Sequence, residues 1–208
     1  AYDVALMSRE LMKHPKITEY TTIWMDTLRN GESQLVNTNK LVRHYSGATG
    51  LKTGTTSQAG HCLSATAERD GMGLCAVILG CSTTDERFGG ARKMLDYGFA
   101  NYAVYTPAVD EAALTPVRVL RGAEETVAPE MDPLTPLLIK KGQEAAITPS
   151  FELAADLEAP VYERQVIGKL TLTLDGSTLA EYEVYASQAV ARLGIKQAFA
   201  RLFAALIA

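Results

Sequence analysis

Residues 50–80 contain three strand-like segments separated by turn signals, and this pattern constrains the fold more than any other feature. Residues 52–57 and 61–67 have the composition of β-strands, and residues 73–80, GLCAVILG, form a continuous apolar run of strand length. Because an Arg-Asp-Gly turn signal at 69–71 precedes that run, we expect it to be a buried strand paired with the strand before it. The segment therefore predicts an antiparallel sheet.

Helical patterns flank these strands. Apolar residues recur at helical spacing in residues 2–13, a short helix or turn is expected at 16–20, and a longer helix at about 86–102. Residues 33–46 show no regular pattern and are expected to be mostly irregular. The long helix has three candidate N-caps, namely Thr83, Thr84 and Asp85. Its basic side chains are expected on a solvated face, namely those of Arg87, Arg92 and Lys93.

The composition changes after Tyr105, where a linker-like stretch is followed by short alternating strands. Residues 168–186, GKLTLTLDGSTLAEYEVYA, predict a hairpin because leucines alternate with threonines on either side of an Asp-Gly turn. The fold class expected is α+β, with a small all-β domain after a sheet flanked by helices. We place the domains at 1–105, 106–186 and 187–208.

The last segment, 187–208, is expected to be an amphipathic helix. Its apolar residues recur on one helical face, namely Ile195, Phe199, Leu202, Phe203 and Leu206. Its charged residues are all basic, namely Arg192, Lys196 and Arg201. The segment is too short to span a bilayer, but it could lie in a membrane interface. The alternative is a helix that packs on a protein core or on a second copy.

Composition excludes several functions. The formal net charge is −4 and no strongly basic block occurs, so nucleic acid is not an expected partner. The three cysteines, Cys62, Cys75 and Cys81, include no Cys-x-x-Cys pair. Cys62 and Cys75 lie in apolar strand-like runs and are expected to be small buried hydrophobic residues. The three histidines do not cluster, so we expect neither a metal nor another cofactor.

The triplet Lys52-Thr53-Gly54 opens the first predicted strand. A lysine at a sheet edge can attract a carboxylate, and the threonine adds a hydroxyl donor. Gly54 has no side chain, so the backbone of an extended ligand could pair with this edge. The alternative is a strand that merely begins with an exposed lysine.

The whole chain resembles the later part of a serine-type D-alanyl-D-alanine carboxypeptidase, a low-molecular-mass penicillin-binding protein. The matching stretches are AYDVALMSREL, NTNKLVRHYSGATGLKTGTTSQAGHCLSATAERDGM, KMLDYGFANY and IGKLTLTLDGSTLAEYEVYA. The resemblance implies that Lys52 and Thr53 bind the terminal carboxylate of the substrate, and that the Thr55 N–H, just past Gly54, is an oxyanion-hole donor. It implies peptidoglycan stem peptides and β-lactams as partners, and a place outside the cytoplasm at the plasma membrane, with 187–208 on the membrane surface.

The family's chemistry also needs a Ser-x-x-Lys motif, whose serine forms the acyl-enzyme, and a Ser-x-Asn motif. None of the nine serines in this sequence begins either motif. We therefore expect a C-terminal portion, inactive alone, whose open sheet edge recruits the missing segment or a neighbouring copy. The pair Ser57 and His61 is no substitute, because residues four apart on a strand are separated by about 13 Å.

Two further interpretations remain open. One is a non-catalytic envelope module, in which the β-domain and tail position something at the membrane or bind a partner. The other is a relative of the β-lactamases, which share the Lys-Thr-Gly motif but lack the β-domain and tail.

Overall fold

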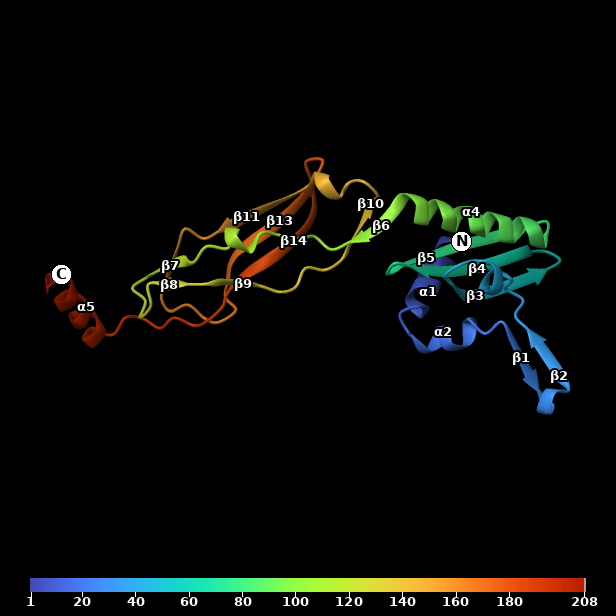
Figure 1. Ribbon diagram of the computed structural model, residues 1–208, viewed down its shortest axis with the longest axis horizontal. Helices are drawn as coiled ribbons and strands as arrows, with labels where there is room; N and C mark the ends of the chain where they lie inside the picture. Colours follow the sequence, from blue (N-terminus) through green and yellow to red (C-terminus); the bar gives the residue numbers. More distant parts are fainter. Residues whose placement is uncertain (208) are drawn as a thin grey trace. The chain divides into compact units, whose positions relative to one another are not determined.

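The computed structural model describes residues 1–207 and has the expected α+β composition (Figure 1). The chain divides into two compact units, one formed by 1–104 with 138–141 and the other by 105–137 with 142–208. The segment 138–141 thus belongs to the first unit, because strand β10 (Leu137–Lys140) pairs with β6 (Tyr102–Tyr105).

The first unit is built on an antiparallel sheet of three strands in the order β3-β4-β5. These strands are β3 (Ala48–Thr56), β4 (Gly60–Arg69) and β5 (Met72–Cys81). The predicted strands and pairings are confirmed, but the prediction that the last strand is buried is wrong. Only Met72 and Ala76 are buried, and Leu79 is 50% exposed. β5 is an edge strand of this sheet, so part of its apolar run stays exposed even though helices lie on both faces.

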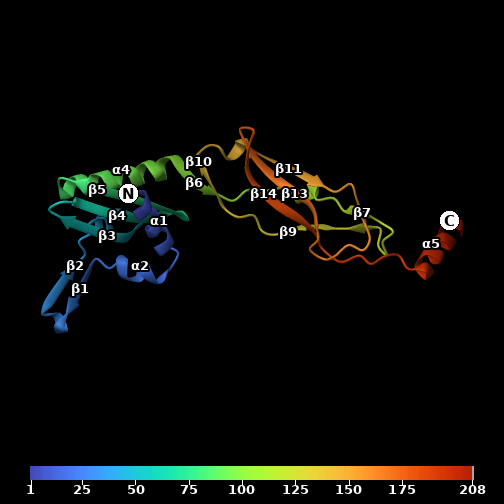
Figure 2. The same ribbon diagram turned by 180° about the vertical axis from the view of Figure 1, so that it is seen from behind.

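Helices lie on both faces of this sheet, as the two opposite views show (Figures 1 and 2). The helices are α1 (Tyr2–Leu11), α2 (Lys16–Thr21), α3 (Leu41–His44) and α4 (Thr84–Asn101). Successive side chains of β4 point to opposite faces of the sheet. Leu63 belongs to the apolar core with α4, whereas Ser64 faces α1, where its Oγ lies 2.7 Å from Ser8 Oγ. α4 begins with a capping box, in which the Thr83 side chain accepts from Glu86 N–H.

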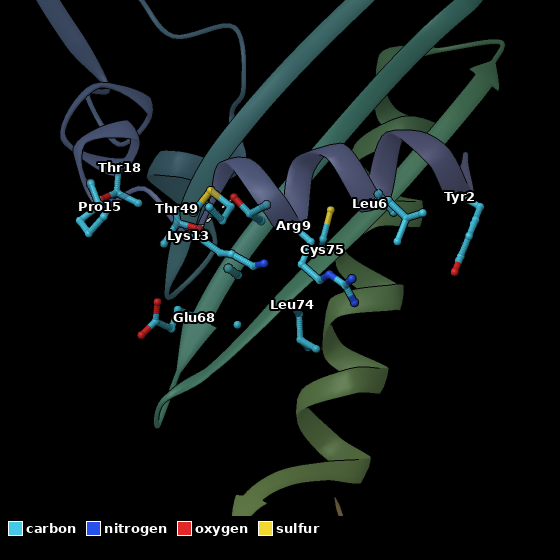
Figure 3. A pocket seen from close by; sticks show the side chains of 15 residues that line it. Tyr2, Leu6, Arg9, Lys13, Pro15, Thr18, Thr49, Glu68, Leu74 and Cys75 are labelled. Carbon is cyan, nitrogen blue, oxygen red and sulfur yellow. Dashed lines mark hydrogen bonds between the residues drawn. The ribbon is translucent and has the colours of Figure 1, made fainter. Parts of the chain in front are cut away.

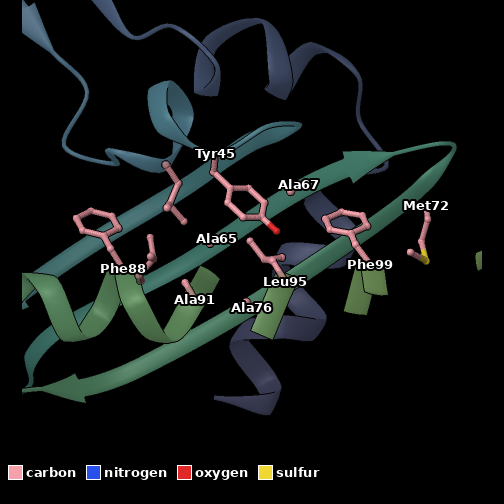
Figure 4. Close-up of a cluster of buried hydrophobic side chains, with 11 residues drawn as sticks. Tyr45, Ala65, Ala67, Met72, Ala76, Phe88, Ala91, Leu95 and Phe99 are labelled. Carbon is pink, nitrogen blue, oxygen red and sulfur yellow. The ribbon is translucent and has the colours of Figure 1, made fainter. Parts of the chain in front are cut away.

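The core of this unit lies between the sheet and α4 (Figure 4). Phe88, Leu95 and Phe99 of α4 pack against small residues of the strands. The strands contribute small side chains to this core, namely those of Ala65, Ala67 and Ala76. Close approach of a helix to a sheet therefore supplies the buried apolar area of this unit.

Residues 33–46, expected to be mostly irregular, contain β2 (Ser33–Val36) and the short α3. β2 pairs with β1 (Met25–Leu28) through a 3₁₀ turn at Arg29–Gly31. Both strands of this hairpin are almost wholly exposed. Alternating β-formers and an Asn-Gly turn signal mark β1 in the sequence, but no buried face gives β2 such a pattern.

The second unit is an all-β structure, and it contains the predicted hairpin. A four-stranded sheet has the order β11-β13-β14-β9, and a three-stranded sheet has the order β12-β7-β8. The strands are β7 (Val117–Leu120), β8 (Thr126–Val127), β9 (Pro129–Met131), β11 (Ile147–Leu153), β12 (Asp156–Glu158), β13 (Val166–Leu174) and β14 (Ser177–Ala186). Two 3₁₀ turns accompany them, Glu111–Ala113 and Glu144–Ala146.

The C-terminal helix, α5 (Ile195–Ile207), begins later than the predicted boundary at residue 187. The preceding residues belong to the β structure, since Val190 is buried in its core and forms a bridge with Val161. Within α5, Phe199 and Phe203 are exposed, whereas the side chain of Leu206, placed on the same face from sequence, lies outside the described side chains. Over residues 1–207, each helix falls short of the length or apolarity that crossing a membrane requires.

Candidate active-site strand

The Lys-Thr-Gly triplet lies on β3, which within residues 1–207 pairs only with β4 and so leaves one edge open. Lys52 is exposed, and its Nζ donates to the carbonyl oxygen of Thr53 at 2.6 Å. Gly54 is also exposed, and a side chain there would meet only the Cβ atom of Cys62, 4.0 Å away. The edge therefore has an exposed lysine ammonium group close to an exposed residue without a side chain, an arrangement that suits a strand-like ligand.

Thr53 differs from its neighbours because its side chain is largely covered, with 9% exposed. Its Oγ1 lies 2.7 Å from the Oγ1 of Thr38, in the segment that joins β2 to α3. Nothing in the sequence pattern pointed to Thr38, which is fifteen residues away and lies in the segment expected to be irregular.

Arg87, in the first turn of α4, was expected on a solvated face, and that prediction is wrong because it is only 6% exposed. Its Nη1 donates to the carbonyl oxygens of Gly54 and Cys62, at 3.3 and 3.2 Å, and to Thr55 Oγ1 at 3.3 Å. Its guanidinium carbon also lies 4.8 Å from the Phe88 ring centroid. These acceptors are neutral oxygens, so they do not cancel the positive charge of Arg87. A positive group therefore lies directly behind the end of the triplet.

Thr55, just past the triplet, is exposed, and its hydroxyl lies 3.3 Å from His61 Nδ1. The same ring nitrogen lies 3.4 Å from Thr84 Oγ1. His61 therefore contacts two threonines, and the pairing with Ser57 that was considered from the sequence gains no support. Ser57 lies in the turn between β3 and β4.

A pocket of about 600 Å³ lies elsewhere, between α1 and the sheet (Figure 3). Leu6 and Arg9 of α1 line it on one side and Leu74 and Cys75 of β5 on the other. No residue of the triplet lines it, so the pocket and the candidate strand are separate features.

The cysteines are free and only partly buried, so the expectation of buried cysteines is wrong in degree. Among residues 1–207 there is no group of three or more His, Cys, Asp or Glu side chains that could hold a metal ion.

These observations define a class of protein that has a Lys-Thr-Gly edge strand in a sheet flanked by helices, followed by an all-β unit. The family model for D-alanyl-D-alanine carboxypeptidase matches residues 1–83. The family model for the penicillin-binding protein 5 C-terminal domain matches residues 102–192. The chain therefore belongs to the low-molecular-mass penicillin-binding proteins, the D-alanyl-D-alanine carboxypeptidase family.

Individual relatives agree with this assignment. The D-alanyl-D-alanine carboxypeptidase DacF of Bacillus subtilis is 34% identical over 198 residues, which cover 93% of this chain and 51% of the relative. DacA of Haemophilus influenzae is 33% identical over 148 residues, covering 70% and 38%. The crystal structure of penicillin binding protein 5 from Haemophilus influenzae superposes with a TM-score of 0.70 at 27% identity, covering 91% and 56%. This chain spans about half the length of the curated relatives it matches.

Proposed function

We propose that this chain supplies the Lys-Thr-Gly strand of a serine-type D-Ala-D-Ala carboxypeptidase, a hydrolase that removes the terminal D-Ala from peptidoglycan pentapeptides. The observation that supports this best is the open edge of β3, where Lys52 and Gly54 are both exposed. The names of the relatives state the same activity for those proteins.

In this proposal the substrate lies along β3 with its terminal carboxylate toward Lys52. The ammonium attracts the carboxylate, and the Thr53 hydroxyl donates a hydrogen bond to it. The backbone N–H of Thr55 donates to the carbonyl oxygen of the scissile bond as that oxygen becomes negative. Arg87 adds a fixed positive charge behind Gly54, which favours an anion at this edge without direct contact.

The nucleophile is not among these residues, because no serine of the sequence begins a Ser-x-x-Lys or Ser-x-Asn motif. We therefore expect this chain alone to bind substrate weakly without hydrolysing it and to form no adduct with penicillin. Hydrolysis and acylation by β-lactams require a polypeptide that provides both motifs. The proposed location is extracytoplasmic, at the cell envelope, with α5 against the membrane surface and a role in peptidoglycan synthesis and cell shape.

Binding at the edge strand can be tested directly. An N-acylated peptide ending in D-Ala-D-Ala, and the same peptide with a C-terminal amide, are titrated into the ¹⁵N-labelled chain by NMR. We expect the acid to bind more tightly than the amide, and Lys52→Ala to abolish that difference. Lys93→Ala, which removes an exposed lysine from α4, is the matched control. An acid preference that persists in Lys52→Ala overturns the assignment of Lys52.

The absence of chemistry can be tested on the same sample. Intact mass spectrometry after incubation with benzylpenicillin should show a single 22.5 kDa chain of unchanged mass. A covalent adduct on this chain overturns the proposal that its nucleophile lies elsewhere.

A second candidate function is a non-catalytic envelope module. It is favoured by one observation, the exposed apolar residues of α5 beside basic ones. In that case the all-β unit and α5 bind a membrane or a partner irrespective of the edge strand, and Lys52→Ala leaves the function intact.

A further inference from the structure

Thr38 is the only side chain of the β2–α3 segment with a hydrogen bond to the triplet among residues 1–207. Its hydroxyl lies 2.7 Å from that of Thr53, and either oxygen can be the donor. Thr38 itself is exposed, whereas Thr53 is largely covered, and the hydrogen bond between them is partly buried.

The segment that carries Thr38 is held in place by the asparagines on either side. The side chain of Asn37 donates through Nδ2 to the carbonyl oxygens of Thr21 and Ile23, at 3.3 and 2.9 Å. Its Oδ1 accepts from the backbone N–H of Asn39 at 2.9 Å. Asn39 is 1% exposed, and its Oδ1 accepts from the first N–H of α3 at 3.2 Å. The hydrogen bonds of Asn37 and Asn39 therefore hold the backbone on both sides of Thr38, and this places the Thr38 hydroxyl beside Thr53.

We propose that Thr38 is a positioning residue for the carboxylate-binding hydroxyl of Thr53. Thr38 donates its proton to Thr53 Oγ1, which directs the proton of Thr53 outward to the substrate carboxylate. The inference rests on the proposed function, because it takes the carboxylate of a D-Ala-D-Ala peptide as the acceptor.

The physical basis is the single proton of each hydroxyl. A hydroxyl that accepts one hydrogen bond donates a stronger one, because the two bonds polarise each other. Thr53 is largely covered, so few water molecules can replace Thr38 as the donor. Without that donor, the Thr53 side chain can rotate about χ1 and turn its hydroxyl to a backbone carbonyl, and the carboxylate then loses a hydrogen bond.

The test compares Thr38→Val, which removes the hydroxyl at nearly constant volume, with Thr38→Ser, which restores it. The readout is the ratio of dissociation constants for the amide and acid peptides, because a general loss of structure weakens both. We expect Thr38→Val to lower this ratio about fivefold and Thr38→Ser to keep it within about twofold of the parent. Thr27→Val, at an exposed position of β1, is the matched control and should keep the ratio. An unchanged ratio in Thr38→Val overturns the inference.

A second measurement separates this inference from the proposed function. Three-bond couplings of the Thr53 methyl group report its χ1 angle in the unliganded chain. We expect one rotamer in the parent and in Thr38→Ser, and averaging in Thr38→Val. If the parent shows no acid preference, the proposed function fails, but a rotamer that stays fixed in Thr38→Val still overturns the positioning role. An acid preference lost in Lys52→Ala but kept in Thr38→Val overturns only the inference.

Discussion

Nη1 of Arg87 lies 3.3 Å from the carbonyl oxygen of Gly54, the last residue of the triplet. The same nitrogen donates to the carbonyl oxygen of Cys62, the residue opposite Gly54 on β4. One buried guanidinium group thus joins the first turn of α4 to both strands where the candidate site ends. Its Nε is buried without a hydrogen-bond partner among the described residues, so burying this donor costs desolvation free energy that no hydrogen bond offsets.

Replacing Arg87 with Gln should lower the free energy of unfolding by about 2–3 kcal/mol, because the hydrogen bonds of a buried charged donor to Gly54, Thr55 and Cys62 are lost. Arg92→Gln makes the same chemical change at an exposed position of α4 and should change it by less than about 0.5 kcal/mol. Urea unfolding followed by circular dichroism measures both. Equal effects in the two variants would show that Arg87 contributes no more than a surface arginine.

Tyr45 forms a second long-range link, because its buried hydroxyl donates to Asp96 Oδ1 on α4 at 2.7 Å. Burial, and then the hydrogen bond to Asp96, raise the pKa of Tyr45 from 10.0 to about 12. The folded state therefore holds this proton more tightly than the unfolded state does. Its contribution to stability is complete below pH 10 and is lost as the pH rises from 10 to about 12.

Tyr45→Phe should accordingly remove one part of the alkaline destabilisation. The check is a tyrosinate absorbance titration of the folded chain, in which the component that titrates near pH 12 should disappear from Tyr45→Phe. Tyr97→Phe, at an exposed position of α4, should retain that component. A component near pH 12 that survives in Tyr45→Phe would assign it to another group.

Local patterns predicted most strands and helices but missed β2 and α3, and the contacts of Arg87 and Thr38 with the triplet required the folded structure. Alternation and turn signals identify the hairpins, and the Thr83 cap marks the start of α4. Arg87 was misplaced because a charged residue was taken to face solvent, although it lies one turn before the buried Ala91. Thr38 was missed because its contact with Thr53 depends on how two segments meet, which periodicity does not encode.

Gly98 tests the close approach of α4 to the sheet. A Cβ atom at Gly98 would clash with Leu74 Cδ1, whereas at Gly89 on the same helix it would meet nothing within 4 Å. Replacing either glycine with alanine brings the same gain in helix propensity, about 1 kcal/mol. Gly98→Ala should therefore be less stable than Gly89→Ala by about 1–2 kcal/mol, the cost of moving Leu74. Thermal unfolding of the pair measures this, and equal stabilities would mean that Leu74 moves freely.

Substitutions on the exposed face of α5 can distinguish membrane binding from packing on protein. Phe199 and Leu202 are 59% and 57% exposed, and Arg201 donates to the carbonyl oxygen of Gly122 at 3.4 Å. If α5 lies in a membrane interface, replacing both Phe199 and Leu202 with serine removes apolar area from the bilayer. The partition coefficient onto vesicles of phosphatidylglycerol and phosphatidylethanolamine should then fall at least about tenfold.

Co-sedimentation with those vesicles is the measurement, and Tyr162→Ser is the matched control. Tyr162 is 67% exposed but lies outside α5, so its replacement should leave vesicle binding unchanged. Raising the salt concentration should weaken binding of the parent, because Lys196 and its basic neighbours attract anionic lipid. A parent chain that ignores vesicles but dimerises through the same two side chains would assign α5 to contact with a second copy, the alternative left open by its sequence.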